Sequence, residues 1–325
     1  MTLYGMPYQG SKSKLAGKIL DILPAADNFY DLFAGGGSVS HYATTMPLKF
    51  GKVYTNDNDK FVMDAFDRAI QDGFKHENHF ADIAEFKYKR RTDPYISCCF
   101  SFGNNWRTYA YSREIEDYKR QYHNAVFFGD GAGMKQYGID LKDALKGADR
   151  YSIELRYSIV QQQIRAQASK VDTIHIVLPH YNAFQRVLRL ANIPRPIITA
   201  LDYRDVVIKP DSVVYCDIPY KGTGTYNYQR FDYDAFYEWC GKQEQLTFIS
   251  EYEMPDNFLK VASFDHRTIF GPVPKCMHPV KECLFVPKHQ YDLLTPHLQH
   301  QIKVLQNDCS TLHDRGEAGP LFWNA

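Results

Sequence analysis

The chain has 325 residues, enough for one large domain or two modest ones with an ample core. Lysine and arginine together number 38, as do aspartate and glutamate, so the totals exclude a strongly basic chain, and any nucleic-acid-binding surface must be local. The seven cysteines include no Cys-x-x-Cys pair, and there is no signal peptide or long apolar run. These features predict a soluble protein of a reducing compartment, the cytoplasm, without a membrane span.

The N-terminal stretch from Met6 to Leu15 predicts a glycine-containing loop that runs into an amphipathic helix ended by Pro24. Lysine and small residues where a loop enters a helix suit an anion such as a carboxylate or a phosphate. The G-x-x-x-x-G-K spacing of a phosphate loop is absent. Taken alone, the stretch is better explained by a capped helix with solvated lysines.

Residues 29–57 have the pattern of the first unit of a nucleotide-binding α/β fold. An apolar strand over Phe29–Phe33 is followed by the glycine turn Ala34–Ser38 and then by a predicted helix, and the glycines allow a ligand to approach the backbone closely. A second predicted strand starts at Lys52 and ends at Asp57, an acid placed to accept hydrogen bonds from ribose hydroxyls. The pair favours an adenosine-containing cofactor. A dinucleotide fingerprint would have Gly or Ala in place of Ser40, which weakens nicotinamide binding without excluding it.

The α/β pattern breaks between Ile83 and Pro196, where helices are predicted around 153–168 and 183–191. From Phe86 to Asn124 eight lysines and arginines stand against four acids, a local excess hidden by the neutral total. Basic side chains suit phosphates, and Asn, Arg and aromatic residues suit base edges, so this segment is a candidate nucleic-acid reader.

Two groups of residues carry this hypothesis. Lys89, Arg90 and Arg91 lie in a run without obvious geometry for base edges, so phosphate contact is their simplest role. Asn105 and Arg107 flank Trp106, a mixture better suited to base edges. A solvated helical face remains an alternative for the basic residues, as does a small core around Trp106 with Arg107 in solvent.

The α/β pattern resumes after Pro196. The predicted strands cover 196–201, 213–216, 246–250, 258–264 and 282–286, with a helix over 234–242. After Tyr220, a polar loop over 221–228 is predicted to be flexible enough to close over a substrate. Beyond Pro287 the chain is polar and weakly patterned, and 321–323 is a candidate docking segment.

The stretch from Val213 to Tyr220 carries the strongest functional signal. Its apolar first half predicts a strand covered on both faces, and the proline then ends the strand, so Asp217 is placed at the carboxyl edge, where open α/β sheets bind ligands. The Asp217 carboxylate and the Ile218 carbonyl can both accept hydrogen bonds from an exocyclic amine, while Tyr220 stacks on the ring that carries it. A plain strand end followed by a turn is the alternative for this motif taken alone.

A metal site is not predicted. Cys276, His278 and Cys283 are close in sequence, but no fourth ligand has suitable spacing.

Taken together, the segments within residues 6–286, most of the insert apart, resemble the Dam-like, alpha-group N6-adenine DNA methyltransferases. Asp31–Ser38 looks like their motif I, and Asp217–Tyr220 is similar to their Asp-Pro-Pro-Tyr motif, with Ile218 in place of a proline. The residues that the resemblance assigns to S-adenosylmethionine are Tyr8, Lys12, Phe33, Gly35, Gly37, Asp57, Asp202 and Tyr203. The catalytic residues that it implies are Asp217, Ile218, Pro219 and Tyr220.

The resemblance implies a Rossmann-like methyltransferase fold of class α/β. A catalytic domain of residues 1–82 and 197–290 would carry an inserted, mainly helical target-recognition domain, 83–196, and a C-terminal tail, 291–325. The expected reaction is methyl transfer to N6 of an adenine flipped out of double-stranded DNA, by a monomer or a weak dimer. Restriction–modification is one setting for such an enzyme, and the sequence names neither the DNA word nor a partner endonuclease. Alternatives are a weak or silent DNA-binding relative, an RNA or protein methyltransferase of the same fold, and a nicotinamide-dependent oxidoreductase.

Overall fold

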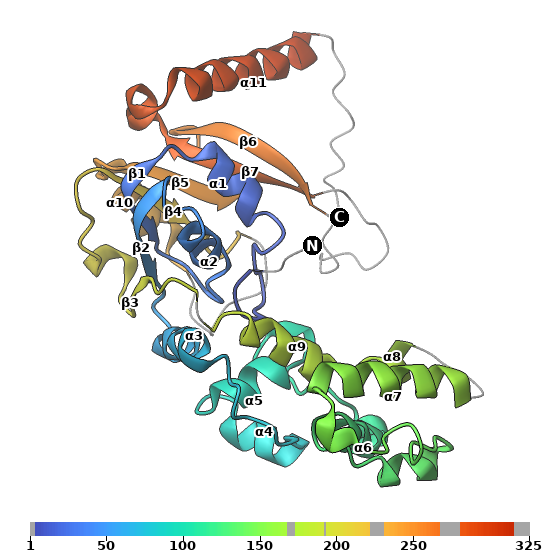
Figure 1. Ribbon diagram of the computed structural model, residues 1–325. Coiled ribbons are helices and arrows are strands. Elements are labelled where there is room, and N and C mark those ends of the chain that lie inside the picture. Colours follow the sequence, from blue (N-terminus) through green and yellow to red (C-terminus); the bar gives the residue numbers. More distant parts are fainter. Residues whose placement is uncertain (1–3, 168–172, 192, 222–230, 267–279, 315–325) are drawn as a thin grey trace. The chain divides into compact units, whose positions relative to one another are not determined.

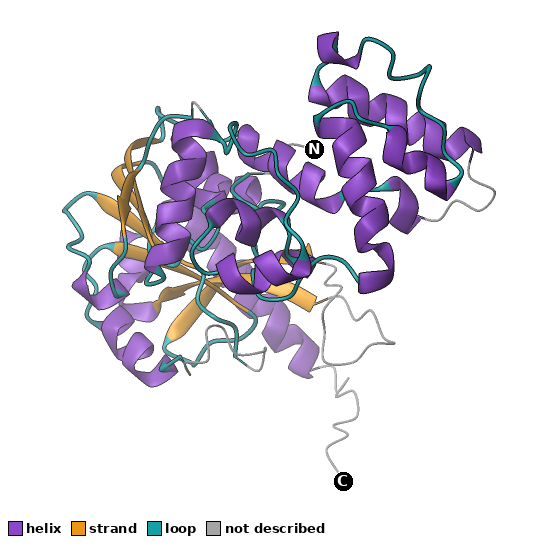
Figure 2. Cartoon of the chain, turned by 90° about the horizontal axis from the view of Figure 1, so that it is seen from below, coloured by secondary structure: helices purple, strands orange, loops and turns teal. Residues whose placement is uncertain are grey.

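The computed structural model describes residues 4–167, 173–191, 193–221, 231–266 and 280–314 (Figure 1). The chain divides into two compact units. The helical unit comprises Met1–Ser13, Gly35–Ser38 and Phe61–Arg195, and the sheet unit comprises Lys14–Ala34, Val39–Lys60 and Pro196–Ala325. Figure 2 shows the strands gathered in one part of the chain and the other part built of helices and loops.

The sheet unit contains a seven-stranded sheet of order β3-β2-β1-β4-β5-β7-β6. The first five strands pair in parallel, and β7 is antiparallel to both β5 and β6. The strands are β1 (Ala26–Asp31), β2 (Phe50–Asn56), β3 (Ile197–Thr199), β4 (Ser212–Cys216), β5 (Leu246–Glu251), β6 (Phe258–His266) and β7 (Val280–Pro287). The strand order reverses between β1 and β4, and ligands of open α/β sheets bind at the carboxyl ends of the strands flanking such a reversal.

Alternation along the buried strands gives the sheet a core on each face. Phe29 belongs to a core shared with α1 (Ala16–Ile22), α2 (Ser38–Thr44) and α11 (Pro296–Asp314). The next residue, Tyr30, belongs to the opposite core, which includes α10 (Tyr233–Gly241). Both faces of the central strands are therefore covered, as their uninterrupted apolar runs predict.

The mixed α/β class predicted from the sequence is confirmed, and three local expectations are corrected. The strand expected over 196–201 stops at Thr199, because the backbone N–H of Leu201 donates to the side-chain oxygen of Asn56 instead of a neighbouring strand. The helix expected over 183–191 spans Pro179–Leu188 as α9, with proline in its first turn, where no N–H is needed.

The third correction concerns the end of the chain. The weakly patterned segment beyond Pro287 forms the short helix η5 (Lys288–Leu293) and then α11, whose Leu298 and Ile302 are buried in the sheet core. Leu298 and Ile302 lie one helical turn apart on the same face, and the polar residues between them obscure the pattern in the sequence. The expectations for residues 222–228 and 321–323 fall outside the described residues.

The helical unit contains nearly all of α3 (Lys60–Asp72) and the helices of residues 83–188. These are α4 (Ile83–Lys89), α5 (Pro94–Cys99), α6 (Arg113–Phe127), α7 (Ile153–Gln167), α8 (Thr173–Ile176) and α9, with short turns η1 (Phe102–Asn104), η2 (Ala132–Tyr137) and η3 (Ala148–Arg150). None of the helices within the described ranges is long and apolar enough to cross a membrane.

A buried hydrogen-bond chain fixes α6 relative to α9 inside this unit. Nε2 of His123 must donate to the carbonyl of Asn78 (2.9 Å), so its Nδ1 accepts from Nε2 of His180 (3.0 Å), and Nδ1 of His180 in turn accepts from the hydroxyl of Tyr111 (2.5 Å). Each donor meets an acceptor only when both imidazoles are neutral. Burial favours that state, because it lowers the pKa of His180 and lowers that of His123 to about 4.

Candidate active site

The catalytic candidates lie where β4 ends, beside the reversal of strand order. All five residues of β4 are buried, and the chain then emerges so that Asp217 is partly exposed at the carboxyl edge. Ile218, which replaces the proline of the related motif, is only 2% exposed and packs in the core that contains Tyr30. Its side chain therefore has a packing role that accounts for an apolar residue here.

The ring of Tyr220 is held from two sides. Its hydroxyl donates to Oε1 of Glu282 (2.7 Å), and the ring of Tyr252 packs against it edge-on with centroids 4.6 Å apart. Glu282 is 3% exposed and lies in β7, the antiparallel strand, so its carboxylate reaches the carboxyl edge of the parallel strands. A short hydrogen bond from a phenol to a buried carboxylate fixes the direction of the ring.

The backbone on either side of Tyr220 is also anchored. The hydroxyl of Tyr233 donates to the carbonyl of Pro219 (2.8 Å), and the backbone N–H of Lys221 donates to Oε2 of Glu251 (3.0 Å). Glu251 is the last residue of β5 and is 1% exposed. Sequence reasoning missed both buried glutamates, although an acid within or at the end of an otherwise apolar strand was the available signal.

Asp31 places a third buried acid at this edge of the sheet. It ends β1 at 1% exposure, and its Oδ2 accepts from the backbone N–H (3.1 Å) and the hydroxyl (2.7 Å) of Ser40 in α2. Ser40 thus ties the helix that follows the glycine turn to β1, which explains a serine where a dinucleotide fingerprint has glycine or alanine.

The charge state of Asp31 follows from this environment. Its Oδ1 is buried without a hydrogen-bond partner among the described residues. Burial, helped by the charges of Asp217 and Asp57 and opposed by the Ser40 hydrogen bonds, raises the pKa of Asp31 from 3.8 to about 7. Near neutral pH, both the neutral and the ionised form of Asp31 are therefore populated.

Asn56 joins the carboxyl ends of three strands. Its Nδ2 donates to the carbonyls of Leu32 (3.2 Å) and Leu201 (3.0 Å), and its Oδ1 accepts from the hydroxyl of Thr199 (2.8 Å) and the N–H of Leu201 (3.0 Å). This saturated amide was also missed, because its partners lie up to 145 residues away in sequence. It positions the next residue, Asp57, at the end of β2.

The two acids assigned to the adenosine part of the cofactor have different local partners. Asp57 is partly exposed, and its Oδ1 accepts from the backbone N–H of Asp59 (2.9 Å). Asp202 receives the guanidinium of Arg204 in a two-pronged contact (2.7 and 2.8 Å), which lowers the pKa of Asp202. Asp202 is therefore an ionised acceptor whose orientation is set by Arg204.

Phe33 and Tyr203 form one aromatic wall in the sheet unit. Their ring centroids are 5.3 Å apart, and both rings pack on Phe236 of α10, at 5.7 and 5.5 Å. Rings fixed in this way present an apolar surface that suits a flat base.

Tyr8, Lys12, Gly35 and Gly37 belong to the helical unit, where the glycine turn packs on the N-terminal loop. Gly35 has φ +49°, and a Cβ built on it would lie 2.8 Å from the ring of Tyr8. Gly37 has φ +69°, and its Cβ would lie 2.4 Å from the ring of Phe66 in α3. Side chains are excluded at both positions by conformation and by space. Lys12 is 8% exposed, with Nζ 3.4 Å from the carbonyl of Gly10.

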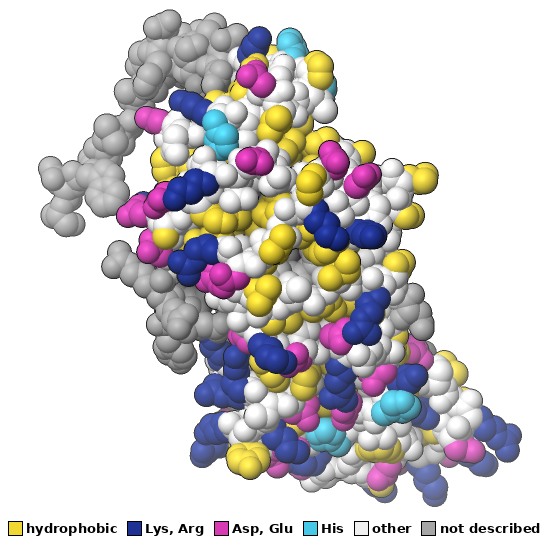
Figure 3. Space-filling view, turned by 90° about the vertical axis from the view of Figure 1, so that its left-hand side faces the viewer, with side chains coloured by type: hydrophobic (Ala, Val, Ile, Leu, Met, Phe, Trp, Pro, Cys, Tyr) yellow, Lys and Arg dark blue, Asp and Glu magenta, His cyan; other side chains and the backbone are white. Residues whose placement is uncertain are grey.

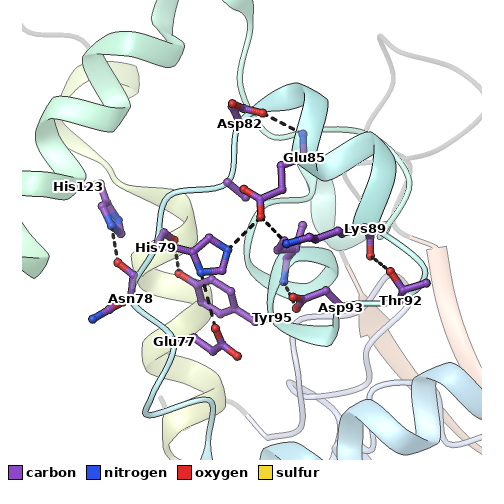
Figure 4. Close-up of polar contacts among 12 residues, drawn as sticks. Glu77, Asn78, His79, Asp82, Glu85, Lys89, Thr92, Asp93, Tyr95 and His123 are labelled. Atoms are coloured by element: carbon purple, nitrogen blue, oxygen red, sulfur yellow. Dashed lines mark hydrogen bonds and ion pairs between the residues drawn. The ribbon is translucent and has the colours of Figure 1, made fainter.

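The basic run at the end of α4 is only partly available to a partner. Lys89 forms an ion pair with Glu85 (2.8 Å) that raises the pKa of Lys89, and Figure 4 shows Lys89 and His79 directed toward that carboxylate. Arg90 and Arg91 are exposed. In the face drawn in Figure 3, lysine and arginine side chains are frequent over the helical unit, at the foot of the view.

The residues around Trp106 form a tight hairpin that is closed by a bridge between Ser101 and Tyr109. Oδ1 of Asn105 accepts from the N–H groups of Arg107 (2.8 Å) and Thr108 (2.9 Å), so this side chain shapes the turn. Trp106 is 2% exposed, as expected from the alternative in which it packs in a small core. Arg107 is partly exposed.

No group of His, Cys, Asp and Glu residues in the described part of the chain could hold a metal ion. Cys276 and His278 lie outside the described residues, so the cluster weighed above is not tested.

The fold and the site together indicate the class of enzyme. A seven-stranded mixed sheet, a glycine turn after β1 and an Asp-x-Pro-Tyr motif at the end of β4 are consistent with a methyltransferase. The chain matches the model of the D12 class N6 adenine-specific DNA methyltransferases over residues 8–258, which is most of its length, and it belongs to that family. It is therefore a DNA adenine N6-methyltransferase. No curated protein matches the chain. Enzymes of this kind generally use S-adenosylmethionine, and their substrate is DNA.

Proposed function

We propose that the chain binds S-adenosylmethionine and methylates N6 of an adenine flipped out of double-stranded DNA, with Asp217, Ile218, Pro219 and Tyr220 as its catalytic motif. The observation that carries the proposal is the anchoring of this motif at the carboxyl edge, where buried Glu282 holds the Tyr220 hydroxyl at 2.7 Å. A site that must orient a flat base benefits from such a preorganised ring.

The reaction requires orientation more than chemical activation. The N6 lone pair of adenine is delocalised into the ring, so the amine is a poor nucleophile. The Asp217 carboxylate and the Ile218 carbonyl accept hydrogen bonds from the two N–H groups and draw the nitrogen toward tetrahedral geometry, which frees the lone pair to form the new N–C bond as the C–S bond breaks. The sulfur leaves with the electron pair of the broken bond as a neutral thioether, and the methylated nitrogen then releases one N–H proton to solvent. S-adenosylmethionine supplies the electrophilic methyl group. Because the amine is unreachable within a duplex, the base leaves the stack and lies against Tyr220.

The charges of the sheet unit suit this cofactor. Asp57 and Asp217 lie near enough to Asp31 to raise its pKa, so acidic side chains gather here, and S-adenosylmethionine carries a sulfonium and an ammonium group. Within the sheet unit, Asp57 would accept from the ribose, while Phe33, Asp202 and Tyr203 would surround the adenine. Within the helical unit, Tyr8, Lys12, Gly35 and Gly37 would hold the methionine part.

Asp57→Ala is expected to weaken S-adenosylmethionine binding by about 1–3 kcal/mol, because the ribose hydroxyls lose their acceptor. Calorimetry measures this, with Asn58→Ala as a control in the exposed neighbouring residue. Binding of duplex DNA should be the same for both variants. Unchanged cofactor affinity in Asp57→Ala would reduce Asp57 to a residue that ends a strand.

We infer that residues 83–196 form the domain that recognises the target DNA, and that 1–82 with 197–290 form the catalytic domain. We also infer that the enzyme works in the cytoplasm as a monomer or weak dimer. Exposed Arg90 and Arg91 at the end of α4, and partly exposed Arg107 in the hairpin, support this role. To contact a phosphate, Lys89 would have to exchange its ion pair with Glu85.

Contacts to phosphates and contacts to base edges should respond differently to substitution. Neutralising Lys89, Arg90 and Arg91 should weaken binding to all duplexes alike, and each lost phosphate contact should reduce the salt slope by about one unit. Arg107→Ala should cost about 1–3 kcal/mol on the methylated site and much less on random DNA. The site is first found by mapping N6-methyladenine in treated DNA, and competition binding is then measured at two salt concentrations.

Lys142→Ala, an exposed change outside the basic run, is the control and should bind like the wild type. Equal losses on cognate and scrambled duplexes would remove base reading by Arg107. Unchanged binding by both sets of variants would place recognition elsewhere in the chain.

A further inference from the structure

The N-terminal loop that carries Tyr8 and Lys12 is held by a side chain from α9. Arg186 donates from Nε to the carbonyl of Gly5 (2.8 Å) and from Nη2 to the carbonyl of Tyr4 (2.6 Å) and the hydroxyl of Ser11 (3.2 Å). One guanidinium thus joins the two ends of the loop. Burial lowers the pKa of Arg186, but an arginine stays charged, so these bonds are charge-assisted.

A second side chain, from the hairpin, holds the middle of the loop. The indole N–H of Trp106 donates to the carbonyl of Pro7 (2.8 Å), and its ring meets the ring of Tyr8 edge-on at 5.3 Å. Trp106 has φ +57°, a conformation that is strained for a bulky residue and persists only where its surroundings enforce it. The hairpin is strained so that this indole reaches the loop.

The loop in turn positions the glycine turn. The N–H of Met6 donates to the carbonyl of Gly36 (2.8 Å), and a Cβ on Gly36 would lie 2.6 Å from Cβ of Tyr8. Gly5, at φ +69°, approaches Ser38 so closely that a Cβ on it would lie 2.6 Å from the Ser38 backbone. A shift of the loop would therefore move Tyr8 away from the glycines or drive it into them.

The helix that supplies Arg186 is itself fixed. His180, in the first turn of α9, belongs to the buried chain of hydrogen bonds that includes Tyr111 and His123. Arg186 therefore acts from a rigid helix.

We propose that Arg186 and Trp106 are positioning residues for the cofactor. They hold the N-terminal loop in the conformation that presents Tyr8 and Lys12 to S-adenosylmethionine, so the segment proposed to read DNA also sets the affinity for the cofactor. The inference rests on the proposed function, in which Tyr8 and Lys12 contact the cofactor.

The test measures cofactor binding and steady-state kinetics on the full chain. Arg186→Met, which keeps length and removes every donor, should raise the Kd and the KM for S-adenosylmethionine on the order of 10-fold. At saturating cofactor kcat should stay within a few-fold of the wild type, and the affinity for DNA should not change. Arg186→Lys should recover part of the loss, because one ammonium can reach some of the three acceptors. Arg189→Met, in an exposed arginine at the end of the same helix, is the matched control.

Trp106→Phe keeps an aromatic ring but removes the indole N–H that binds the carbonyl of Pro7. This variant tests the proposal if Arg186→Met does not fold. A raised Kd in Trp106→Phe with an unchanged circular dichroism spectrum supports the proposal. Tyr8→Ala separates the two levels of inference. If the wild type binds the cofactor, Tyr8→Ala weakens binding and the Arg186 and Trp106 variants bind like the wild type, the positioning role is overturned while the proposed function stands. Absence of cofactor binding by the wild type overturns both.

Discussion

Replacing Asp217 by alanine is expected to slow methyl transfer by roughly 100- to 1000-fold, the usual cost of one lost acceptor in a preorganised site. The carboxylate lies at the end of β4, and the following residues are fixed by Tyr233, Glu251 and Glu282. Alanine therefore removes the acceptor without releasing the motif. The rate at saturating substrates is the quantity to measure, since the loss should appear in kcat.

Asp256→Ala, an exposed acid of the same unit, is the control and should keep full activity. Asp217→Asn is a stricter version, because it retains the shape but presents one oxygen and one donor to the amine. A rate for Asp217→Ala within a few-fold of the wild type would remove Asp217 from the catalytic motif, provided that the circular dichroism spectrum shows an intact fold.

The second large effect concerns stability and pH. Asp31 keeps its proton in the folded state up to about pH 7, whereas in the unfolded chain it ionises near 3.8. Its contribution to stability is therefore complete below about pH 4 and is lost as the pH rises to about 7, at about 1.4 kcal/mol per pH unit and about 4 kcal/mol in all. The sign is opposite to that of an acid in an ion pair.

Asp31→Asn isolates this contribution from the other titrating groups. Asparagine cannot ionise, yet its oxygen can still accept from Ser40. Urea unfolding between about pH 5 and about pH 8 should show the wild type losing stability relative to Asp31→Asn until about pH 7, and parallel curves above it. Curves that run parallel over the whole range would mean that Asp31 ionises normally in the folded protein.

Where local structure depends on residues close together in the chain, it could be predicted from the sequence. The apolar run of β4, the proline after it and the glycine turn after β1 each determine a local backbone conformation, and the predicted strands and the edge position of Asp217 followed from them. The mixed α/β class was predictable for the same reason.

Residues whose role depends on distant partners were not readable. Asn56, Glu251, Glu282 and Arg186 look like ordinary polar residues until the fold brings them to backbone groups and hydroxyls far along the chain. For Trp106 the sequence left two interpretations open, a place among base-reading residues or a small core, and its burial against the N-terminal loop agrees with the second.

The most direct test of the account is an assay with tritiated S-adenosylmethionine and duplex DNA, followed by digestion and separation of the nucleosides. With the wild type the label should be recovered in N6-methyladenine, and with Asp217→Ala it should be nearly absent. Label in another nucleoside, or transfer only to RNA or protein, would contradict it, as would no transfer by a folded wild-type enzyme.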